Sequence, residues 1–365
     1  MTGAGRPVPA EAPAGLPAGF APALIAWQRR EGRHGLPWQG TRDPYRVWLS
    51  EIMLQQTQVS TVLSYYPRFL ARFPDVASLA AAPVDDVMAL WSGLGYYSRA
   101  RNLHRCAQAV MKDWAGAFPQ RSADLATLPG IGASTAAAIA SFCFGERVSI
   151  LDGNVRRVLT RLLAFDRDLA QAGPQRELWE LAQALVQPDA EADDMVAYTQ
   201  GLMDLGATVC TRTRPSCALC PVQDLCEGRR SGDPTRFPVR TRRLNRRFEA
   251  WWLLLIERPS DDGHTEVWLH KRPERGIWAG LFCPPVFDSR EALCAAVPSA
   301  MAELLHDGDA VAHALTHREL RLHPVSLQWP AQADAPGDAA SGQWVRRDRL
   351  PQVGLPAPVR PWLAA

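Results

Sequence analysis

Apolar residues recur at spacings of three and four along most of the chain, from residue 21 to about residue 225. This period is that of a helix with one buried face. Asp43, Pro44 and Tyr45 predict the start of one helix, because aspartate caps helix N-termini and proline suits the first helical position. The pattern predicts helices over residues 45–63, 84–91, 99–114, 123–128, 134–142, 154–163, 176–186 and 195–205.

The pattern changes at residue 248, where short apolar runs replace the helical period. These runs predict strands over residues 248–257, 265–271, 280–287 and 320–329, and a helix over 290–297. Asp261, Asp262 and Gly263 predict the turn between the first two strands. The preceding segment, 229–247, carries eight arginines. It predicts an exposed basic linker, which either touches phosphates or only keeps the chain soluble.

The chain of 365 residues is long enough for about two domains. We therefore expect a multi-domain protein with an all-α domain followed by an α+β domain. Its expected segments are a disordered tail rich in Pro, Ala and Gly (1–20), the helical domain (21–228), the basic linker (229–247) and the α+β domain (248–365).

Composition narrows the class of protein. An apolar fraction of 47% with 21% charged residues is an ordinary globular mixture, which excludes collagen, a coiled coil and overall disorder. No apolar run reaches 18 residues, and the N-terminus lacks the pattern of a signal peptide, so we expect a cytoplasmic protein without a membrane span. In that reducing compartment the eight cysteines are not expected to form a disulfide framework.

Four cysteines lie within 17 residues near the end of the helical region, with one pair at x2 spacing. They are Cys210, Cys217, Cys220 and Cys226. Four thiolates can surround one soft metal centre, and ligand type alone allows either zinc or a [4Fe–4S] cluster. The other four cysteines are scattered and are expected to be ordinary thiols.

Leu128-Pro129-Gly130-Ile131-Gly132 separates two predicted helices, and Asp152 follows about twenty residues later. Gly130 and Gly132 allow a tight turn whose N–H groups could bind a phosphate, although an ordinary helix–helix loop has the same composition. Asp152, before Gly153 and Asn154, is either a functional carboxylate or a helix cap. Taken with the four cysteines, this order of motifs resembles the helix-hairpin-helix-GPD superfamily of DNA glycosylases, in its endonuclease III-like branch.

The resemblance implies a [4Fe–4S] cluster on the four cysteines. Members with lyase activity carry a lysine two residues after the second hairpin glycine, and this chain has Ser134 there. Its only lysines, Lys112 and Lys271, are far from the motif in sequence. An amine nucleophile is therefore not evident, which favours a glycosylase without lyase activity.

Two further segments make the resemblance more specific. The first contains Leu36-Pro37-Trp38 and continues through Pro44 to Val59, and the second runs from Trp91 to Leu103 and contains Gly93-Leu94-Gly95-Tyr96-Tyr97. They are similar to the MutY-type adenine DNA glycosylases, which remove adenine paired with 8-oxoguanine or with guanine. The similarity is strong over residues 20–228 and looser over 248–365.

Glu51 lies among apolar residues of the helix predicted over 45–63. An apolar setting raises the pKa of a carboxyl and lets it act as a general acid near neutral pH, although an exposed helical glutamate fits the periodicity as well. The resemblance implies that Glu51 protonates adenine, chiefly at N7, and that Asp152 stabilises the oxocarbenium-like sugar. Asn154 would orient these groups, and Ser134 stands where some relatives have a tyrosine that assists the acid.

The family removes a base that has been flipped out of the duplex. By resemblance, Gln56 and Tyr96 would fill the space in the duplex, with Thr57 and Leu94 beside them. The competing interpretation is that Tyr96 and Tyr97 are both aromatic residues of the core. The adenine pocket would be formed by Arg33, Trp38, Leu54 and Gln200.

Residues 248–365 resemble the Nudix-like C-terminal domain that reads 8-oxoguanine in this family. Only Arg290 and Glu291 approach the Mg²⁺-binding pattern of a catalytic Nudix site, so we expect no nucleotide hydrolysis. Thr316 and His317 align with the lesion-reading loop, in which Leu315 replaces an aromatic residue. His317 as an ordinary residue at a strand end is the alternative.

The expected partner is double-stranded DNA containing A opposite 8-oxoguanine or G, bound by a monomer associated with the nucleoid. A repair protein or clamp could also bind the linker. Other classes remain open at this point: an endonuclease III-like lyase for oxidised pyrimidines, a non-catalytic iron–sulfur protein that binds DNA or senses redox state, and a nucleotide hydrolase.

Overall fold

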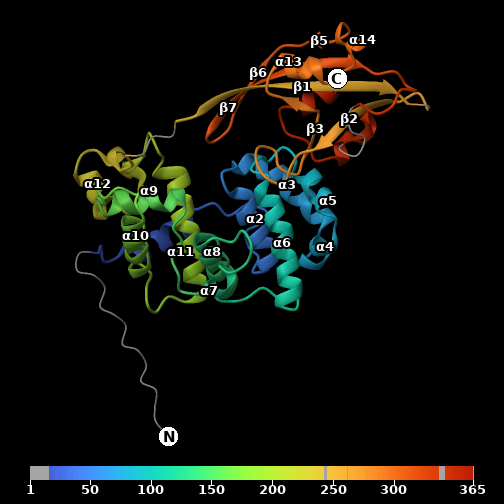
Figure 1. The fold of residues 1–365 in the computed structure, drawn as a ribbon. Helices are drawn as coiled ribbons and strands as arrows, with labels where there is room; N and C mark the ends of the chain where they lie inside the picture. Colours follow the sequence, from blue (N-terminus) through green and yellow to red (C-terminus); the bar gives the residue numbers. More distant parts are fainter. Residues whose placement is uncertain (1–15, 242–244, 261, 337–341, 365) are drawn as a thin grey trace. The chain divides into compact units, whose positions relative to one another are not determined.

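The computed structural model describes residues 16–241, 245–260, 262–336 and 342–364 (Figure 1). The chain divides into two compact units, one made of Met1–Gln55 and Trp114–Arg243 and the other of Gln56–Asp113 and Leu244–Ala365. The helical segment expected over residues 21–228 is therefore divided between the two units, because residues 56–113 group with the C-terminal sheet. Hydrogen bonds such as that between Ser92 and Leu355 join the two segments of this second unit.

The first unit consists of helices around one apolar core. The core includes Trp27 of α1, Ala138 of α8, Leu159 of α9, Leu178 of α10 and Leu202 of α11. The helices of this unit are α1 (Phe20–Glu31), α2 (Pro44–Leu54), α7 (Ser122–Leu125), α8 (Ala133–Phe144), α9 (Gly153–Leu162), α10 (Ala172–Ala184), α11 (Ala192–Asp204) and α12 (Glu227–Arg230).

Short turns of 3-10 or π type complete the first unit, at η1 (Leu205–Val209), η2 (Cys217–Leu219), η3 (Gln223–Leu225) and η4 (Pro234–Arg236). Residues 1–15 of the expected disordered tail lie outside the described residues. Phe20, the last residue of that expected tail, is buried at the start of α1.

The helix expected over residues 45–63 is two helices, α2 and α3 (Val59–Arg72). Asp43 caps α2 as expected, accepting a hydrogen bond from the Tyr45 N–H at 2.9 Å. The interruption comes at Gln56, whose φ of 56° is left-handed and incompatible with a continuing right-handed helix. The apolar spacing of residues 45–63 does not reveal this break, because the helical period continues on both sides of Gln56.

The second unit combines a small helical layer with a mixed sheet. Its helices before the linker are α3, α4 (Val76–Ala81), α5 (Val84–Trp91) and α6 (Ser98–Asp113). The strands are β1 (Arg247–Pro259), β2 (Thr265–Lys271), β3 (Phe282–Cys283), β4 (Val286–Phe287), β5 (His306–Asp307), β6 (Val311–Ala314), β7 (Arg318–Gln328) and β8 (Gly342–Arg346).

The sheet is built around the parallel pair β1 and β7, in which Trp252 lies opposite His323. The other pairings are antiparallel: β2 and β4 with β1, β3 and β8 with β2, and β5 and β6 with β7. Leu293 of α13 (Arg290–Ala295) belongs to the core cluster that contains Leu254 of β1. Sequence periodicity predicted the long strands, but strands of two to five residues carry too little pattern.

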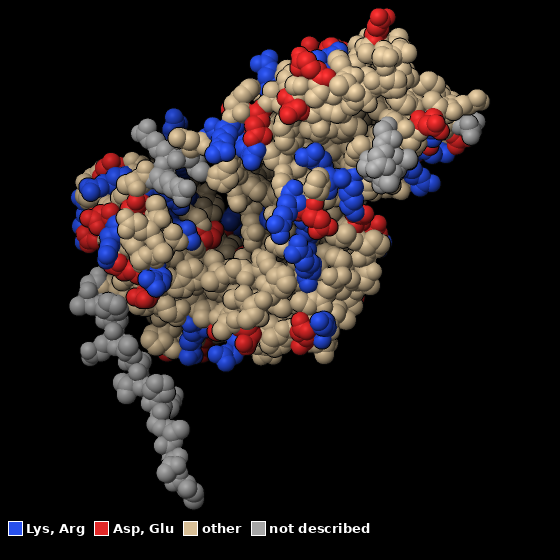
Figure 2. All heavy atoms as spheres, in the orientation of Figure 1, with Lys and Arg blue, Asp and Glu red and all other residues tan. Residues whose placement is uncertain are grey.

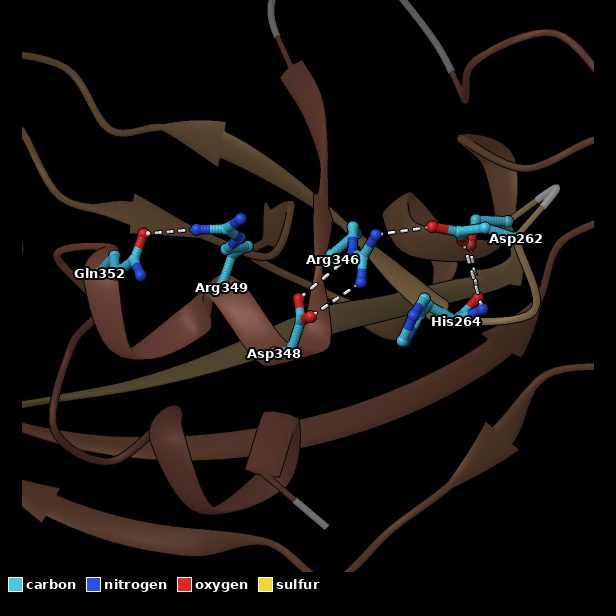
Figure 3. Close-up of polar contacts among 7 residues, drawn as sticks. Asp262, His264, Arg346, Asp348, Arg349 and Gln352 are labelled. Carbon is cyan, nitrogen blue, oxygen red and sulfur yellow. Dashed lines mark hydrogen bonds and ion pairs between the residues drawn. The ribbon is translucent and has the colours of Figure 1, made fainter.

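The remaining elements of this unit are α14 (Ser299–Ala302), η6 (Arg347–Gln352) and α15 (Arg360–Ala364). An exposed ion-pair network links the β1–β2 turn to the end of β8 (Figure 3). Arg346 contacts both Asp262 and Asp348, at 2.6 and 2.8 Å, and the His264 N–H donates to Asp262. Because Asp262 and Asp348 are exposed and Arg346 is only half-buried, the network contributes little to stability.

Only part of the expected basic linker, 229–247, is exposed. Phe237 is buried, and the main-chain N–H of Leu169 donates to the Val239 carbonyl at 3.2 Å. Residues 242–244 lie outside the described residues. The apolar side chain of Phe237 explains why this stretch packs against the first unit despite its arginines.

Basic and acidic side chains are interspersed over the visible surface, and Lys and Arg atoms gather over α3 and α6 (Figure 2). Arg105 and Lys112 are exposed on α6. Across the described residues, every helix falls short of the length and apolar character needed to cross a bilayer.

Candidate active site

Glu51 and Asp152 lie in the first unit, close enough for their charges to interact. Glu51 follows the fully buried Leu49 on α2. Burial raises the pKa of Glu51 to about 8, and the nearby charge of Asp152 contributes to that increase. The structure therefore gives Glu51 the protonation state of an acid at neutral pH.

Asp152 is the N-cap of α9 and accepts a hydrogen bond from the Val155 N–H at 2.8 Å. Burial raises the pKa of Asp152, while the main-chain N–H groups of Val155 and Asn154 act in the opposite direction. The positive charges of Arg157 and Arg156 also favour the ionised carboxylate. Both interpretations of Asp152 are therefore compatible. The residue is a helix cap, and its carboxylate is also close enough to Glu51 for their charges to interact.

Ser134 supports the segment that leads to Asp152. Its Oγ accepts a hydrogen bond from the Leu151 N–H at 3.0 Å. The next residue, Thr135, accepts from the Gln55 side chain at 3.2 Å through its hydroxyl. The first turn of α8 thus contacts both the end of α2 and the approach to α9, the two helices that carry the carboxyls.

Asn154 is connected to the cysteine loop through Arg157. The Arg157 guanidinium donates to the Asn154 Oδ1 and to the Gly206 carbonyl, at 2.8 and 2.7 Å, and to the Cys210 carbonyl at 2.8 Å. A side chain at Gly206 would not fit, because its Cβ would lie 2.7 Å from the Cβ of Asn154. Asn154 is therefore oriented by Arg157.

Arg161 fixes the start of the cysteine loop. This side chain is almost fully buried, and it donates to the carbonyls of Phe237, Thr211 and Arg212. It also contacts the Cys210 Sγ at 3.4 Å. One buried guanidinium therefore joins α9, the loop and the segment after α12.

The four candidate metal ligands are the half-buried thiols of Cys210, Cys217, Cys220 and Cys226. Burial raises the pKa of Cys220 to about 11, and the charges of the other three thiols add to this effect, so the four lie near one another. Within the described ranges, no three His, Cys, Asp or Glu side chains are already arranged to hold a metal ion. The donor set itself, four thiols in one short loop, fits a soft metal centre.

Two of the expected pocket residues converge on Asp204. Its fully buried carboxylate accepts from the Arg33 guanidinium at 2.7 Å and from the Gln200 amide at 2.8 Å. Trp38 is buried before α2, and Leu54 is the last residue of α2. Sequence reasoning missed Asp204, because a lone acid in an apolar helix has no motif around it.

The hairpin glycines have the expected backbone. Gly130 has a φ of 77°, and Gly132 is the N-cap of α8, with open space where a side chain would be. The N-terminus of α8 is therefore accessible to a phosphate at this turn.

The residues expected to contact the opened duplex and the opposite base, unlike the hairpin glycines, lie in the second unit. Tyr96 is exposed at 44% and has a left-handed φ of 48°, and Gln56 is also exposed and left-handed. Thr316, in the exposed turn between β6 and β7, has its hydroxyl 3.5 Å from that of Tyr96. His317 is exposed in the same turn, where its carbonyl accepts from the Arg247 N–H.

The side chain of Leu94 is buried within this loop, so its expected place beside the duplex-contacting residues stays a prediction. Tyr97 is also buried, so the core interpretation applies to Tyr97 and the exposed one to Tyr96. Sequence reasoning missed Arg99, which is buried and donates to Thr57 Oγ1, 3.0 Å away.

Comparisons with known proteins agree with this arrangement. The family model of the HhH-GPD superfamily base excision DNA repair proteins matches residues 49–184, and that of the NUDIX domain matches 255–365. Among curated proteins, the adenine DNA glycosylase of Buchnera aphidicola subsp. Acyrthosiphon pisum is 31% identical and covers 93% of this chain and 95% of its own length. That of Homo sapiens is 33% identical over 91% of this chain and 71% of its own.

Among solved structures, a thermostable thymine-DNA glycosylase is similar with a TM-score of 0.51 and 26% identity, covering 58% of this chain and 95% of that protein. The likeness in sequence extends over both units, and the helical fold is shared. The chain therefore belongs to the adenine DNA glycosylases, DNA N-glycosylases of the HhH-GPD superfamily with a Nudix-like C-terminal domain that act in base excision repair.

Proposed function

We propose that this protein removes adenine paired with 8-oxoguanine, and adenine paired with guanine, without cleaving the DNA strand. The pairing of Glu51 with Asp152 carries the proposal, because their environments stabilise different protonation states. The raised pKa of Glu51 keeps a proton available at neutral pH. The N–H groups and arginines around Asp152 favour its charge.

In this mechanism Glu51 gives its proton to N7 of a flipped-out adenine. The bond between the sugar C1′ and N9 then breaks, and its electron pair leaves with the base. The Asp152 carboxylate stabilises the positive charge that develops on the sugar, as paired carboxylates do in glycoside hydrolysis. Water attacks C1′ and releases a proton, which leaves a hydroxyl on C1′ of the abasic site, with Asn154 orienting the reacting groups.

Base recognition is divided among other residues in the same proposal. Arg33 and Gln200, joined by Asp204, are the polar part of the adenine pocket, with Trp38 and Leu54 as its apolar part. Gln56, Thr57 and Tyr96 contact the opened duplex. Thr316 and His317 read the opposite 8-oxoguanine, and the hairpin at Gly130 and Gly132 binds the DNA backbone.

We further propose that Cys210, Cys217, Cys220 and Cys226 hold a [4Fe–4S] cluster. The donor set supports this, and the group would supply a rigid cross-link for the loop that Arg161 and Arg157 connect to α9. We also propose that the protein acts at the nucleoid in the cytoplasm, because the proposed substrate is damaged chromosomal DNA.

A lyase mechanism is the second candidate, and the distribution of lysines argues against it. Lyase chemistry of the superfamily uses a lysine amine as nucleophile. Lys112 and Lys271 both belong to the second unit, and Lys271 is paired with Asp85 at 2.7 Å. The unit that contains Asp152 has Ser134 at the corresponding hairpin position.

The test uses duplexes containing A opposite 8-oxoguanine, A opposite G, or thymine glycol opposite A, analysed with and without hot alkali. We expect breaks at adenine in the first two duplexes, and only after alkali. Cleavage at thymine glycol without alkali would assign the protein to the lyase branch. Absence of adenine release by the wild-type protein would reject the proposed function.

A further inference from the structure

The loop from Ser92 to Tyr97 joins α5 to α6 and carries the exposed Tyr96. Gly93 and Gly95 are left-handed, with φ of 106° and 71°, and Tyr96 is left-handed at 48° although it is not a glycine. Such a backbone conformation is unfavourable for a non-glycine residue and persists only where the surroundings impose it. The contacts around this loop identify what imposes it.

The C-terminal segment, residues 354–363, contacts the beginning of this loop. The buried Ser92 hydroxyl donates to the Leu355 carbonyl at 2.5 Å, and it accepts from the Leu355 N–H at 3.2 Å and the Arg360 Nε at 3.0 Å. One donated and two accepted bonds use the full capacity of a serine hydroxyl. The Ser92 hydroxyl thus makes all the hydrogen bonds that it can make, and these bonds join two segments more than 250 residues apart in sequence.

The end of the loop contacts the same place. The Tyr97 hydroxyl donates to the Leu355 carbonyl and accepts from the Gly93 N–H, both at 3.4 Å. The C-terminal segment is itself well anchored, since Leu355, Val359 and Leu363 are buried. Both ends of the loop therefore bond to one carbonyl of the C-terminal segment.

Arg99 contacts the loop from within. Its guanidinium donates to the carbonyls of Leu94 and Gly95, at 3.2 and 3.1 Å, and lies 5.4 Å from the centre of the Tyr96 ring. The loop is thereby held between Arg99 and the C-terminal segment, with Tyr96 at its exposed tip.

We propose that the C-terminal segment, through Leu355 and Arg360, is a positioning element that sets the conformation of the Tyr96 loop for recognition of the base opposite adenine. It acts through Ser92 and Tyr97, both of which are buried. This inference rests on the proposed function. It assigns to the last residues of the chain a role in selecting the substrate, separate from the chemistry of Glu51 and Asp152.

The test compares Ser92→Ala with wild type in single-turnover release of adenine from A opposite 8-oxoguanine and from A opposite G. Ser92→Ala removes hydrogen bonds of ordinary strength, so we expect the preference for 8-oxoguanine to fall about three- to tenfold. Ser92→Thr, which keeps the hydroxyl, should restore the preference. Ser64→Ala is the matched control, because Ser64 is exposed on α3 of the same unit and bonds only to its own helix.

A double-mutant cycle separates positioning from a general loss of structure. If Ser92 acts through the loop, Ser92→Ala should have no further effect on the preference in a Tyr96→Ala background. Arg360→Leu provides a second variant should Ser92→Ala fold poorly, and it should lower the preference in the same direction. Thermal unfolding of each variant verifies that it is folded.

An unchanged preference in folded Ser92→Ala and Arg360→Leu would overturn the inference, as would additive effects of Ser92→Ala and Tyr96→Ala. These outcomes differ from a failure of the proposed function. In that case the wild-type protein would release adenine from neither duplex.

Discussion

At the residue scale, the main feature is the different setting of two carboxyl groups. Glu51 loses hydration and faces the charge of Asp152, while Asp152 receives N–H groups and the field of two arginines. The first effect keeps a proton on Glu51. Burial raises the pKa of Asp152 as well, but its N–H groups and arginines oppose that increase and favour the charged carboxylate. A pair with separated proton affinities can act as acid and as electrostatic stabiliser in one step.

The rate of adenine release should therefore depend on the protonation of Glu51. Because the acid works only when protonated, the single-turnover rate should fall as pH rises through about 8, approaching tenfold per pH unit above that value. A pH–rate profile of the wild-type protein measures this. A rate that stays constant from pH 7 to pH 10 would show that Glu51 is not the acid.

Glu51→Gln is the matching control. We expect it to increase the free energy of unfolding, which is unusual for a substitution at a buried site. The raised pKa means that the native state binds a proton more tightly than the unfolded chain does. Stability from this group is therefore present at low pH and is lost as pH rises from about 4.5 to about 8. Glu51→Gln should abolish adenine release yet raise the free energy of unfolding at pH 8–9, by about 1–3 kcal/mol.

At the scale of elements, the site depends on how α8, α9 and the cysteine loop are joined. Ser134 links α8 to the residue before Asp152, and Arg157 and Arg161 link α9 to the loop. These links are hydrogen bonds to main-chain groups, so they fix the course of the backbone rather than the chemistry itself.

Ser134→Ala should slow adenine release and lower stability. The substitution leaves the buried Leu151 N–H without its acceptor, which costs about 1–3 kcal/mol, and it frees the approach to Asp152. Urea unfolding and single-turnover kinetics measure the two effects, with Ser134→Thr as the variant that keeps the hydroxyl. Wild-type kinetics in Ser134→Ala would mean that this bond does not position Asp152.

Arg161→Leu should release the cysteine loop, because it removes a buried guanidinium from three carbonyl acceptors. We expect a loss of stability above about 3 kcal/mol and a lower iron content of the purified protein. Arg167→Ala is the control, since Arg167 forms an exposed pair with Glu177 in the same unit and should change stability by less than about 1 kcal/mol. Equal iron content in Arg161→Leu and wild type would refute the link.

The elements also show what a sequence can and cannot predict. The cysteine spacing, the hairpin glycines and the position of Glu51 are local patterns, and they indicated the family correctly, while the roles of the site residues stay predictions. The break at Gln56 was missed, because a single left-handed residue leaves the apolar period intact. Asp204 and Arg99 were missed because their partners lie on other segments, and only the folded chain brings those partners close.

At the scale of the whole molecule, the residues proposed to cleave the bond and those proposed to recognise the opposite base belong to different units. The candidate acid, its partner carboxylate, the pocket and the cysteines belong to the first unit. Tyr96, Thr316 and the C-terminal segment belong to the second. Residues 56–113 follow α2 in sequence yet group with the sheet, a division that no composition change along the chain indicated. Substitutions around Tyr96 in the second unit should therefore alter substrate preference, and those around Glu51 should alter bond cleavage.

The most direct test of the account is adenine release by Asp152→Asn, measured together with its affinity for a duplex containing A opposite 8-oxoguanine. The substitution removes the charge that would stabilise the sugar cation and keeps the size of the side chain. We predict that the single-turnover rate falls at least about a hundredfold while the affinity for DNA changes by less than about threefold. A rate close to that of the wild type would show that Asp152 does not stabilise the transition state, and would contradict the mechanism.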